Sequence, residues 1–409
     1  MKTDILFLIT IFLFTASCEK QENTGEPKQI NISKTTEQVV EADNLFGINL
    51  FQTVLANDTT DNIFISPTSV ALALAMTYNG ADGTTKKAME ETLRKQGLTP
   101  EELNQSYKDL IAALVSADPK VLREIANSIW YREDIQVLPD FVNTNETYYD
   151  AEVSSLVFDN MAKEIINGWV ADKTHDKIKE VIDNIPADAI MYLINAIYFK
   201  GVWRSAFDAD ETTNRPFYLT DGSVVEVPTM KQRDTIRYLS NDLISAVELP
   251  YGEGNFSMIV MLPNDGKTTG DVVSAMSIEN WDSWMQAFSE RDVLVNLPQL
   301  KFEYKRLLNQ ELTGMGMGVA FTSEADFPGI NPSLDLFISR VIHKTFVEVN
   351  EDGTEAAAVT VVEVSLTAMP GEVVHPVYFL VNKPFIFAIR EKDTGTILFI
   401  GRVNNPLKH

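Results

Sequence analysis

The sequence of 409 residues predicts an α+β fold. Two patterns predict it: apolar residues at helical spacing dominate the first half of the chain, and short apolar runs typical of strands gather in the second half. Apolar residues make up 45% of the chain, which is enough to fill a sizeable core. Length alone suggests two or three domains, but no linker-like break follows about residue 40.

The first predicted elements are helices. Residues 44–55 carry apolar side chains at a spacing of three and four, and residues 69–78 are almost wholly apolar, so the second helix should be buried. Residues 99–102, Thr-Pro-Glu-Glu, have the pattern of an N-terminal cap. Amphipathic helices are predicted at residues 84–93, 101–116 and 161–174.

Strand patterns take over later in the chain. These runs are short, apolar and rich in β-branched or aromatic residues, and turn residues flank them. The predicted strands are residues 191–199, 223–230, 245–249, 258–261, 293–297 and 385–389.

The N-terminus has the pattern of a targeting signal. Lys2 gives a short basic start, and residues 5–14 form an apolar run that is too short to cross a bilayer as a helix of the mature protein. Small residues then precede Cys18, the single cysteine of the chain, as in a bacterial lipoprotein signal, although Thr15 stands where leucine is usual. We expect residues 1–17 to be a signal peptide and Cys18 to carry lipid; ordinary signal cleavage is the alternative.

Residues 18–40 are polar and predict a flexible tether behind the lipidated cysteine. A lipidated Cys18 would leave no thiol for a disulfide or for redox chemistry. The sequence therefore predicts a protein of the bacterial cell envelope, at the outer membrane or cell surface, that meets the membrane only through the lipid at Cys18. A secreted protein is the alternative.

The net charge is −24, from 58 acidic and 34 basic residues. Nucleic acids, anionic membrane surfaces and heparin-type polyanions all bind clustered Lys and Arg, so this charge disfavours them as partners. Lys86 and Lys87 are the one notable basic pair early in the chain, and a solvated helix face explains them.

The sequence contains no motif typical of an enzyme. No Gly-x-Ser-x-Gly occurs, and residues 265–268 (Asp-Gly-Lys-Thr) lack the earlier glycine of a phosphate-binding loop, because Met261 stands there. We expect no enzymatic activity, no metal and no cofactor. The four histidines have no metal-ligand spacing: His175, His343, His375 and His409.

The most informative segment is residues 354–366, which alternate like a strand. Glu355 and Glu363 would share one face, and the closely following Pro370 and Gly371 indicate an exposed loop. A strand pattern beside a loop suggests a segment with two states, exposed and buried in a sheet; an ordinary edge strand is the alternative. The face without charge would carry Thr354, Ala356, Ala358, Thr360, Val362, Val364 and Leu366.

Residues 351–360, Glu-Asp-Gly-Thr-Glu-Ala-Ala-Ala-Val-Thr, resemble the hinge of the reactive-centre loop of serpins. The resemblance covers nearly the whole chain from about Ala42 to Pro406 and implies one large domain at residues 41–409. This domain would have a metastable central β-sheet, surrounding helices and an exposed reactive-centre loop at about residues 351–378. Further blocks resemble the family in order: residues 62–69, 166–178, 195–203, 247–251, 258–263, 312–330, 384–387 and 397–406.

Several site residues follow from this resemblance alone. It implies a buried polar network beneath the sheet, called the shutter, which must stay hydrogen-bonded because an unsatisfied buried group costs about 1–3 kcal/mol. It also implies a tryptophan where the loop begins to enter. The shutter positions are Ser66, Ser69, Asn195 and His343, and the tryptophan is Trp203. The hinge positions are Glu351, Gly353, Thr354, Glu355, Ala356, Ala357, Ala358 and Thr360.

The resemblance implies a suicide-substrate inhibitor, which is monomeric and forms a covalent complex with its target protease. The protease would cut the loop, and the cut loop would insert into the sheet before the acyl-enzyme is hydrolysed. The intact hinge favours this reading; a non-inhibitory serpin that acts as a binding or carrier protein is the alternative.

Counting along the loop as in the family places the cut between Thr367 and Ala368, with Leu366 and Val364 in neighbouring subsites. These side chains favour elastase-like or subtilisin-like serine proteases, or papain-like cysteine proteases. Trypsin-like proteases are disfavoured because residues 351–382 contain no Lys or Arg. The loop is longer than usual in the family, which leaves the position of the cut open by a few residues.

Overall fold

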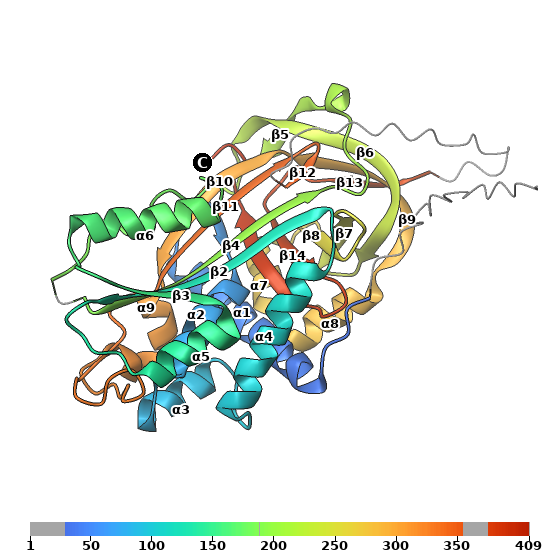
Figure 1. Ribbon diagram of the computed structural model, residues 1–409. Helices are drawn as coiled ribbons and strands as arrows, with labels where there is room; N and C mark the ends of the chain where they lie inside the picture. The colour runs from blue at the N-terminus through green and yellow to red at the C-terminus, as the bar shows by residue number, and fades with distance from the viewer. Residues whose placement is uncertain (1–28, 188, 355–374, 409) are drawn as a thin grey trace, which may run out of the picture.

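Figure 1 shows a computed structural model of the protein, which describes residues 29–187, 189–354 and 375–408. Most of the described helices gather at one end of the molecule, and two large sheets occupy the rest. This is the predicted α+β arrangement. The helices are α1 (Lys34–Asn57), α2 (Pro67–Tyr78), α3 (Gly83–Thr92), α4 (Pro100–Ser116), α5 (Pro139–Tyr149), α6 (Asn160–Lys173), α7 (Thr269–Ala275), α8 (Ile278–Ala287) and α9 (Asn309–Leu312), with short helical turns at Ala209–Glu211, Thr313–Met317 and Gly318–Phe321.

The larger sheet has the strand order β1-β15-β14-β8-β7-β6-β9-β13, with β5 beside β6. Its strands are rich in apolar residues, many of which pack into the main core. They are β1 (Asn62–Ile65), β5 (Thr213–Tyr218), β6 (Val224–Ser240), β7 (Ile244–Pro250), β8 (Phe256–Pro263), β9 (Ser289–Pro298), β13 (Val377–Leu380), β14 (Phe385–Glu391) and β15 (Ile397–Val403).

The smaller sheet has the order β10-β11-β12-β4-β2-β3. Helix α2 packs against β4, and α6 contacts β2 and β4 through a second apolar cluster, separate from the main core. The sheet therefore lies between two layers, and Figure 1 shows α6 crossing it. Its strands are β2 (Val121–Arg132), β3 (Ala151–Leu156), β4 (Met191–Val202), β10 (Leu300–Leu307), β11 (Ile342–Asn350) and β12 (Gly353–Thr354).

The folded domain begins earlier than the sequence predicted. Residues 34–40 were assigned to the tether and the first helix to residues 44–55, but α1 already starts at Lys34. The side chain of Ser33 accepts a hydrogen bond from the backbone N–H of Thr36 and caps the helix. Val39 and Val40 are buried among polar neighbours, which is why the composition of this stretch resembled a linker.

Several strands are longer than the apolar runs that predicted them. The predicted strand at residues 223–230 is the first half of β6, which continues to Ser240 beside β9 and β7. Its second half is polar because alternate residues face water. The predicted strand ranges do not include β1, β2, β3, β5, β10, β11, β13 and β15. In β10 and β11 the polar residues of the outer faces hide the apolar pattern.

Candidate functional site

The smaller sheet is open between β4 and β11. Strand β12 joins them at one end, where Thr354 pairs with Val349 of β11 and with Gly201 of β4. Beyond β12, no ladder joins β4 to β11 in the described part of the chain. A further strand placed there would complete the ladders of both neighbours.

Two cavities follow this opening. The larger, of about 120 Å³, lies between α2, β4 and β11 and includes Asn195 and His343 in its wall. The smaller, of about 20 Å³, lies nearer to β12 and includes Thr354. The space beneath the missing strand is therefore underpacked, whereas protein interiors are normally filled to crystal-like density.

Thr354 is seated in the sheet by a buried hydrogen bond. Its Oγ1 lies 2.6 Å from the Oη of Tyr251, and both residues are buried. Burial raises the pKa of Tyr251, so its hydroxyl stays protonated and can donate. The ring of Tyr251 stacks on Trp203 with centroids 4.4 Å apart.

Trp203 lies at the β12 end of the opening, beside the turn that leads from β11 into β12. Its indole Nε1 donates to the backbone carbonyl of Asn350 at 2.9 Å, and its backbone N–H donates to the carbonyl of Asp352. The side chain of Asn350 in turn accepts hydrogen bonds from the backbone N–H groups of Asp352 and Gly353. These contacts fix the turn that leads from β11 into β12.

Gly353 is required by close packing in this turn. Its φ is +151°, and a Cβ at this position would lie 2.0 Å from the carbonyl oxygen of Gly201. Any side chain would push β12 away from β4. The glycine of the hinge motif therefore has a steric explanation in the native sheet.

Glu351 anchors the base of the hinge. Its carboxylate accepts hydrogen bonds from the hydroxyl of Thr212 at 2.5 Å and from the side-chain amide of Gln299 at 2.8 and 2.9 Å. Its backbone carbonyl accepts from the N–H of Phe207. Hydrogen bonds to a charged group are among the stronger ones in proteins, so these bonds fix the position of Glu351 at the start of the hinge.

The predicted shutter residues lie together at the larger cavity. The backbone N–H of Ser66 donates to Nε2 of His343 at 3.0 Å, and the hydroxyl of Ser66 donates to the carbonyl of Leu398 at 2.7 Å. The hydroxyl of Ser69 donates to the carbonyl of Asn195 at 3.4 Å. Burial lowers the pKa of His343 to about 4, so its ring is neutral at physiological pH and can accept.

The network extends further than the sequence indicated. The side-chain amide of Asn195 donates to Oδ1 of Asn127 on β2 at 2.7 Å, and Asn127 donates to the carbonyl of Tyr149 at 2.6 Å. Asn127, Gln299 and the hydroxyl of Tyr251 were not identified as site residues from the sequence. Tyr251 stood within a recognised block, whereas Asn127 and Gln299 carried no pattern of their own.

The remaining predicted positions fall outside the described residues, which stop at Thr354 and resume at His375. They are Glu355, Ala356, Ala357, Ala358 and Thr360 of the hinge, the reactive bond Thr367–Ala368 with Leu366 and Val364, and Cys18.

The two ends of the predicted loop lie in different sheets. At its start Thr354 is already part of β12 in the smaller sheet, and at its end Val377 begins β13, parallel to β9 in the larger sheet. The predicted loop end at residue 378 therefore falls inside a strand.

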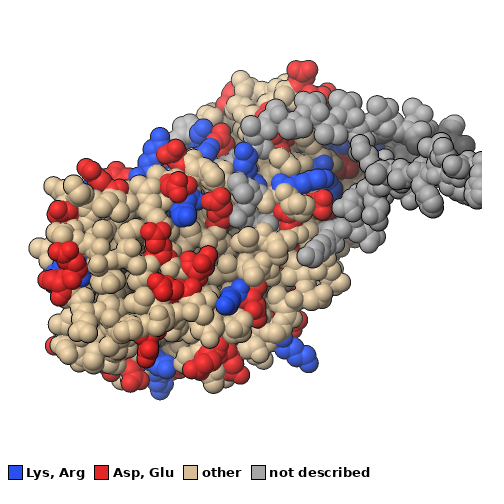
Figure 2. Space-filling view, in the orientation of Figure 1, with Lys and Arg blue, Asp and Glu red and all other residues tan. Residues whose placement is uncertain are grey.

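Among the described residues, no group of His, Cys, Asp and Glu has the arrangement of a metal site. None of the helices in the same ranges is long and apolar enough to cross a membrane. Figure 2 shows Asp and Glu spread over most of one face, with Lys and Arg mainly in its upper part.

Comparisons with known proteins agree with this geometry. The family model described as serpin (serine protease inhibitor) matches residues 41–406. The chain is 34% identical to leukocyte elastase inhibitor A of Rattus norvegicus over 385 residues, which cover 90% of this chain and 100% of the relative.

Solved structures show the same fold. The native state of the thermophilic serpin tengpin has a TM-score of 0.82 and 30% identity, with 92% of this chain and 96% of tengpin covered. A complex of thyroxine-binding globulin with thyroxine has a TM-score of 0.80 and 28% identity, with 90% of this chain and 99% of the globulin covered. The chain belongs to the serpin family.

Proposed function

We propose that this protein is a suicide-substrate inhibitor of proteases. The observation that carries the proposal is the position of Thr354, the last residue of the short strand β12, at the head of an opening that continues between β4 and β11. When a protease cuts beyond this point, the freed segment can continue the strand that β12 begins. The protein then acts as a substrate that traps its protease and catalyses no reaction itself.

The energy for trapping would come from completing the sheet. Each added residue forms ladder hydrogen bonds worth about 1 kcal/mol each and buries apolar surface against α2 and the core at about 25 cal/mol per Å². The inserted strand would also fill the two cavities along its path. A long segment therefore gives a large favourable change, which can hold a distorted acyl-enzyme.

The target class follows from the loop sequence. With the cut between Thr367 and Ala368, the residues before it are small or of medium size and apolar, which suits elastase-like and subtilisin-like serine proteases or papain-like cysteine proteases. The similarity to leukocyte elastase inhibitor A supports an elastase-like target. Absence of Lys and Arg from residues 351–382 argues against trypsin-like targets.

The location proposed is the bacterial cell envelope, with residues 1–17 removed and Cys18 lipidated. The tether would then end before Ile30, because Ile30 and Ile32 pack against the core ahead of α1, which begins at Lys34. Cys18→Ser tests this: it should move the protein from the membrane fraction to the soluble fraction. If the variant stayed in the membrane fraction, the lipid anchor would be contradicted, while the proposed inhibitory mechanism would be unaffected.

The inhibitory mechanism is tested by incubating the full chain with an elastase-like and a subtilisin-like protease. We expect a complex that survives SDS, and the mass of the released C-terminal fragment should locate the cut at Thr367 or within a few residues. Complete cleavage with no complex would overturn inhibition and favour the alternative, a non-inhibitory serpin that binds or carries a ligand.

A further inference from the structure

A strap covers the opening in the smaller sheet. We use this name for residues 174–187, which lead from the end of α6 back to β4. Ile178 of the strap lines both cavities between β4 and β11, and Val181 also lines the larger one. A strand that grows from β12 along the opening must therefore pass beneath this strap.

The strap is held firmly to the β4 side. Oδ1 of Asn167 on α6 accepts hydrogen bonds from the backbone N–H groups of Val181 and Ile182, and its amide donates to the carbonyl of Ile182. Ile178, Val181 and Ile182 are buried with Trp130 of β2 in the second apolar cluster. Contacts of this kind are buried and are not screened by salt.

The strap is held to the β11 side mainly by charges. Nζ of Lys305 on β10 lies 2.7 Å from Oδ1 of Asp183, and Nζ of Lys177 lies 3.3 Å from Oε2 of Glu348 on β11. Lys344 donates to the backbone carbonyl of Glu180 at 3.3 Å. The hydrogen bond from Lys305 lowers the pKa of Asp183, so the carboxyl group of Asp183 is ionised over the physiological pH range.

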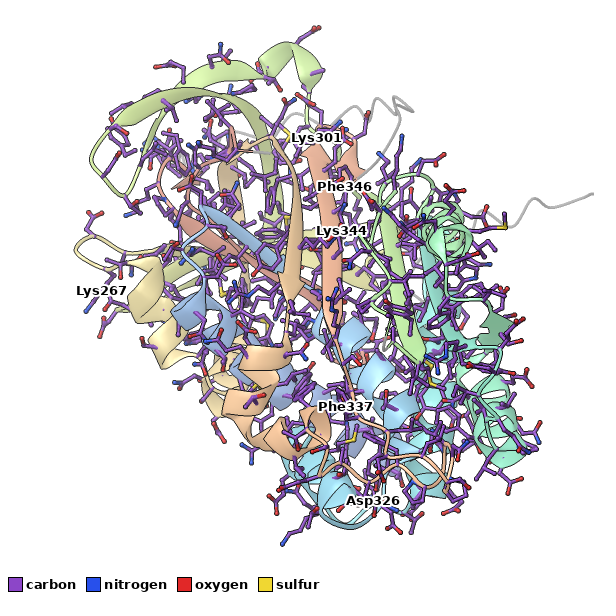
Figure 3. The ribbon with its side chains drawn as sticks, turned by 90° about the vertical axis from the view of Figure 1, so that its left-hand side faces the viewer. Lys267, Lys301, Asp326, Phe337, Lys344 and Phe346 are labelled. Atoms are coloured by element: carbon purple, nitrogen blue, oxygen red, sulfur yellow. The ribbon has the colours of Figure 1, made fainter. Side chains whose placement is uncertain are left out.

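These charges lie on the outer face of the sheet because β10 and β11 alternate. His343, Thr345, Val347 and Val349 point inward and are buried. Figure 3 shows Lys301, Phe346 and Lys344 one below another along the outer side of these strands. Ile342 and Phe346 of β11 also pack against the second apolar cluster, to which the strap contributes Ile178, Val181 and Ile182.

A new strand would move β10 and β11 away from β4 by about 4.8 Å, the spacing between neighbouring strands. The strap cannot stay bound to both sides, because its contacts on each side are already at bonding distance. Exposed ion pairs are weaker than the buried contacts on the β4 side, so the ion pairs should break first.

We propose that the pairs Asp183–Lys305 and Lys177–Glu348 set the rate at which the cut loop inserts, by holding the strap across its path. This inference rests on the proposed inhibitory function. Asp183 and Lys305 are positioning residues: they touch neither the protease nor the reactive bond. Loosening them should make insertion faster and therefore trapping more efficient.

The chain offers a closely matched control. Lys163 of α6 pairs with Glu180 of the strap at 2.8 Å, with side chains 30% and 53% exposed, and Lys305 pairs with Asp183 at 2.7 Å, with side chains 34% and 70% exposed. The first pair lies within the α6 side and the second crosses the opening. Lys163→Gln and Lys305→Gln therefore remove similar pairs with different consequences for insertion.

The test measures insertion by stopped-flow tryptophan fluorescence after the loop is cut, together with the number of inhibitor molecules consumed per protease trapped. K305Q should insert about twofold to fivefold faster than wild type, the effect of one exposed ion pair, and should consume fewer molecules per protease. K163Q should match wild type. The melting temperatures of the intact variants should fall equally, which separates a rate effect from lost stability.

Salt and charge reversal give two further checks. Wild type should insert faster at 1 M NaCl than at 0.05 M, because salt screens exposed pairs, and the K177Q/K305Q variant should lose most of this dependence. The swapped variant D183K/K305D should restore the wild-type rate. Equal rates for K305Q and K163Q, or slower insertion by K305Q, would overturn the proposal.

Failure of this inference can be told apart from failure of the proposed function. If wild type traps protease and K305Q behaves like K163Q, only the role of the ion pairs is wrong. If wild type neither traps protease nor becomes more heat-resistant once its loop is cut, no insertion occurs and both proposals fall together.

Discussion

At the scale of single residues, the site depends on which side chains can lie beneath a sheet. Thr354 is buried against Tyr251. If the chain continued as an inserted strand, the alternation of side chains would put Ala356 on the same face as Thr354. Small uncharged residues suit this face because a charge buried there without a partner costs several kcal/mol. Glu355, next in sequence, would then belong to the opposite face.

This alternation predicts the effect of hinge substitutions. Thr354→Arg and Ala356→Glu should slow insertion so that the acyl-enzyme is hydrolysed first and the inhibitor becomes a substrate. Ala357→Glu places the same charge one residue further on, on the face that the alternation predicts for Glu355 and Glu363, and should keep inhibition. The yield of SDS-resistant complex measures all three. Wild-type yield from Thr354→Arg or Ala356→Glu would rule out insertion from this hinge.

His343 gives the molecule a pH dependence. Burial lowers its pKa from 6.5 to about 4, so the native ring resists a proton that the unfolded chain binds readily. The folded protein is therefore most stable, with respect to this histidine, above about pH 6.5. As the pH falls from 6.5 toward 4, the unfolded chain takes up the proton and the free energy of unfolding falls by about 3 kcal/mol.

The variant His343→Gln tests this dependence, because the side-chain oxygen of glutamine can still accept a hydrogen bond from the backbone N–H of Ser66. The variant should be less stable than wild type at pH 7.5, and the difference should shrink between pH 6.5 and 4.5. Thermal melts of both proteins across this range measure it. A difference that stays constant with pH would show that the proton on His343 is not responsible.

At the scale of elements, the sequence predicted the hinge and the shutter because short motifs carry them. Gly353 and Thr354 lie in one continuous run, and Ser66, Asn195 and His343 each lie in or near a block that resembles the family. The pair Asp183–Lys305 could not be predicted in this way. Its members are far apart in the chain, and only the path of the strap over β10 brings them together.

Element boundaries were harder to predict than the elements themselves. The apolar run at residues 191–199 found β4, but no local pattern shows that one edge of this strand pairs with β2 while the other meets β12 only at its end. An open sheet is a property of pairing between distant segments. The resemblance to serpins implied the opening, and physical patterns in the sequence did not.

The hydrogen bond that holds β12 in the smaller sheet can be tested by mutation. The hydroxyls of Tyr251 and Thr354 are each other's buried partner, so Tyr251→Phe or Thr354→Val alone leaves one of them without its bond and should cost about 1–2 kcal/mol. The double variant should cost less than the sum of the two, because no orphaned hydroxyl remains. Unfolding in urea measures the three variants. Strict additivity would show that the pair does not hold β12.

At the scale of the whole molecule, the described part of the smaller sheet is open between β4 and β11, and the proposed loop starts from one sheet and ends in the other. Thr354 lies in the smaller sheet and Val377 in the larger, so the chain between them is held at two points. A cut in this chain would separate the part that follows Thr354 from the part that leads to Val377. The sheet can then close only if the cut lies far enough beyond Thr354 to provide a strand.

The cut molecule should therefore be more stable than the intact one. A full strand in the opening adds ladder hydrogen bonds along β4 and β11 and fills cavities beside Asn195 and His343. A net gain of about 10 kcal/mol would raise the melting temperature by about 10 °C in a domain of this size. Thr354→Arg serves as the control, since its cut form should gain little. Calorimetry of intact and cut samples measures this difference. Equal melting temperatures for intact and cut wild type would mean that the native protein stores no energy in its open sheet. Trapping by insertion would then have no driving force.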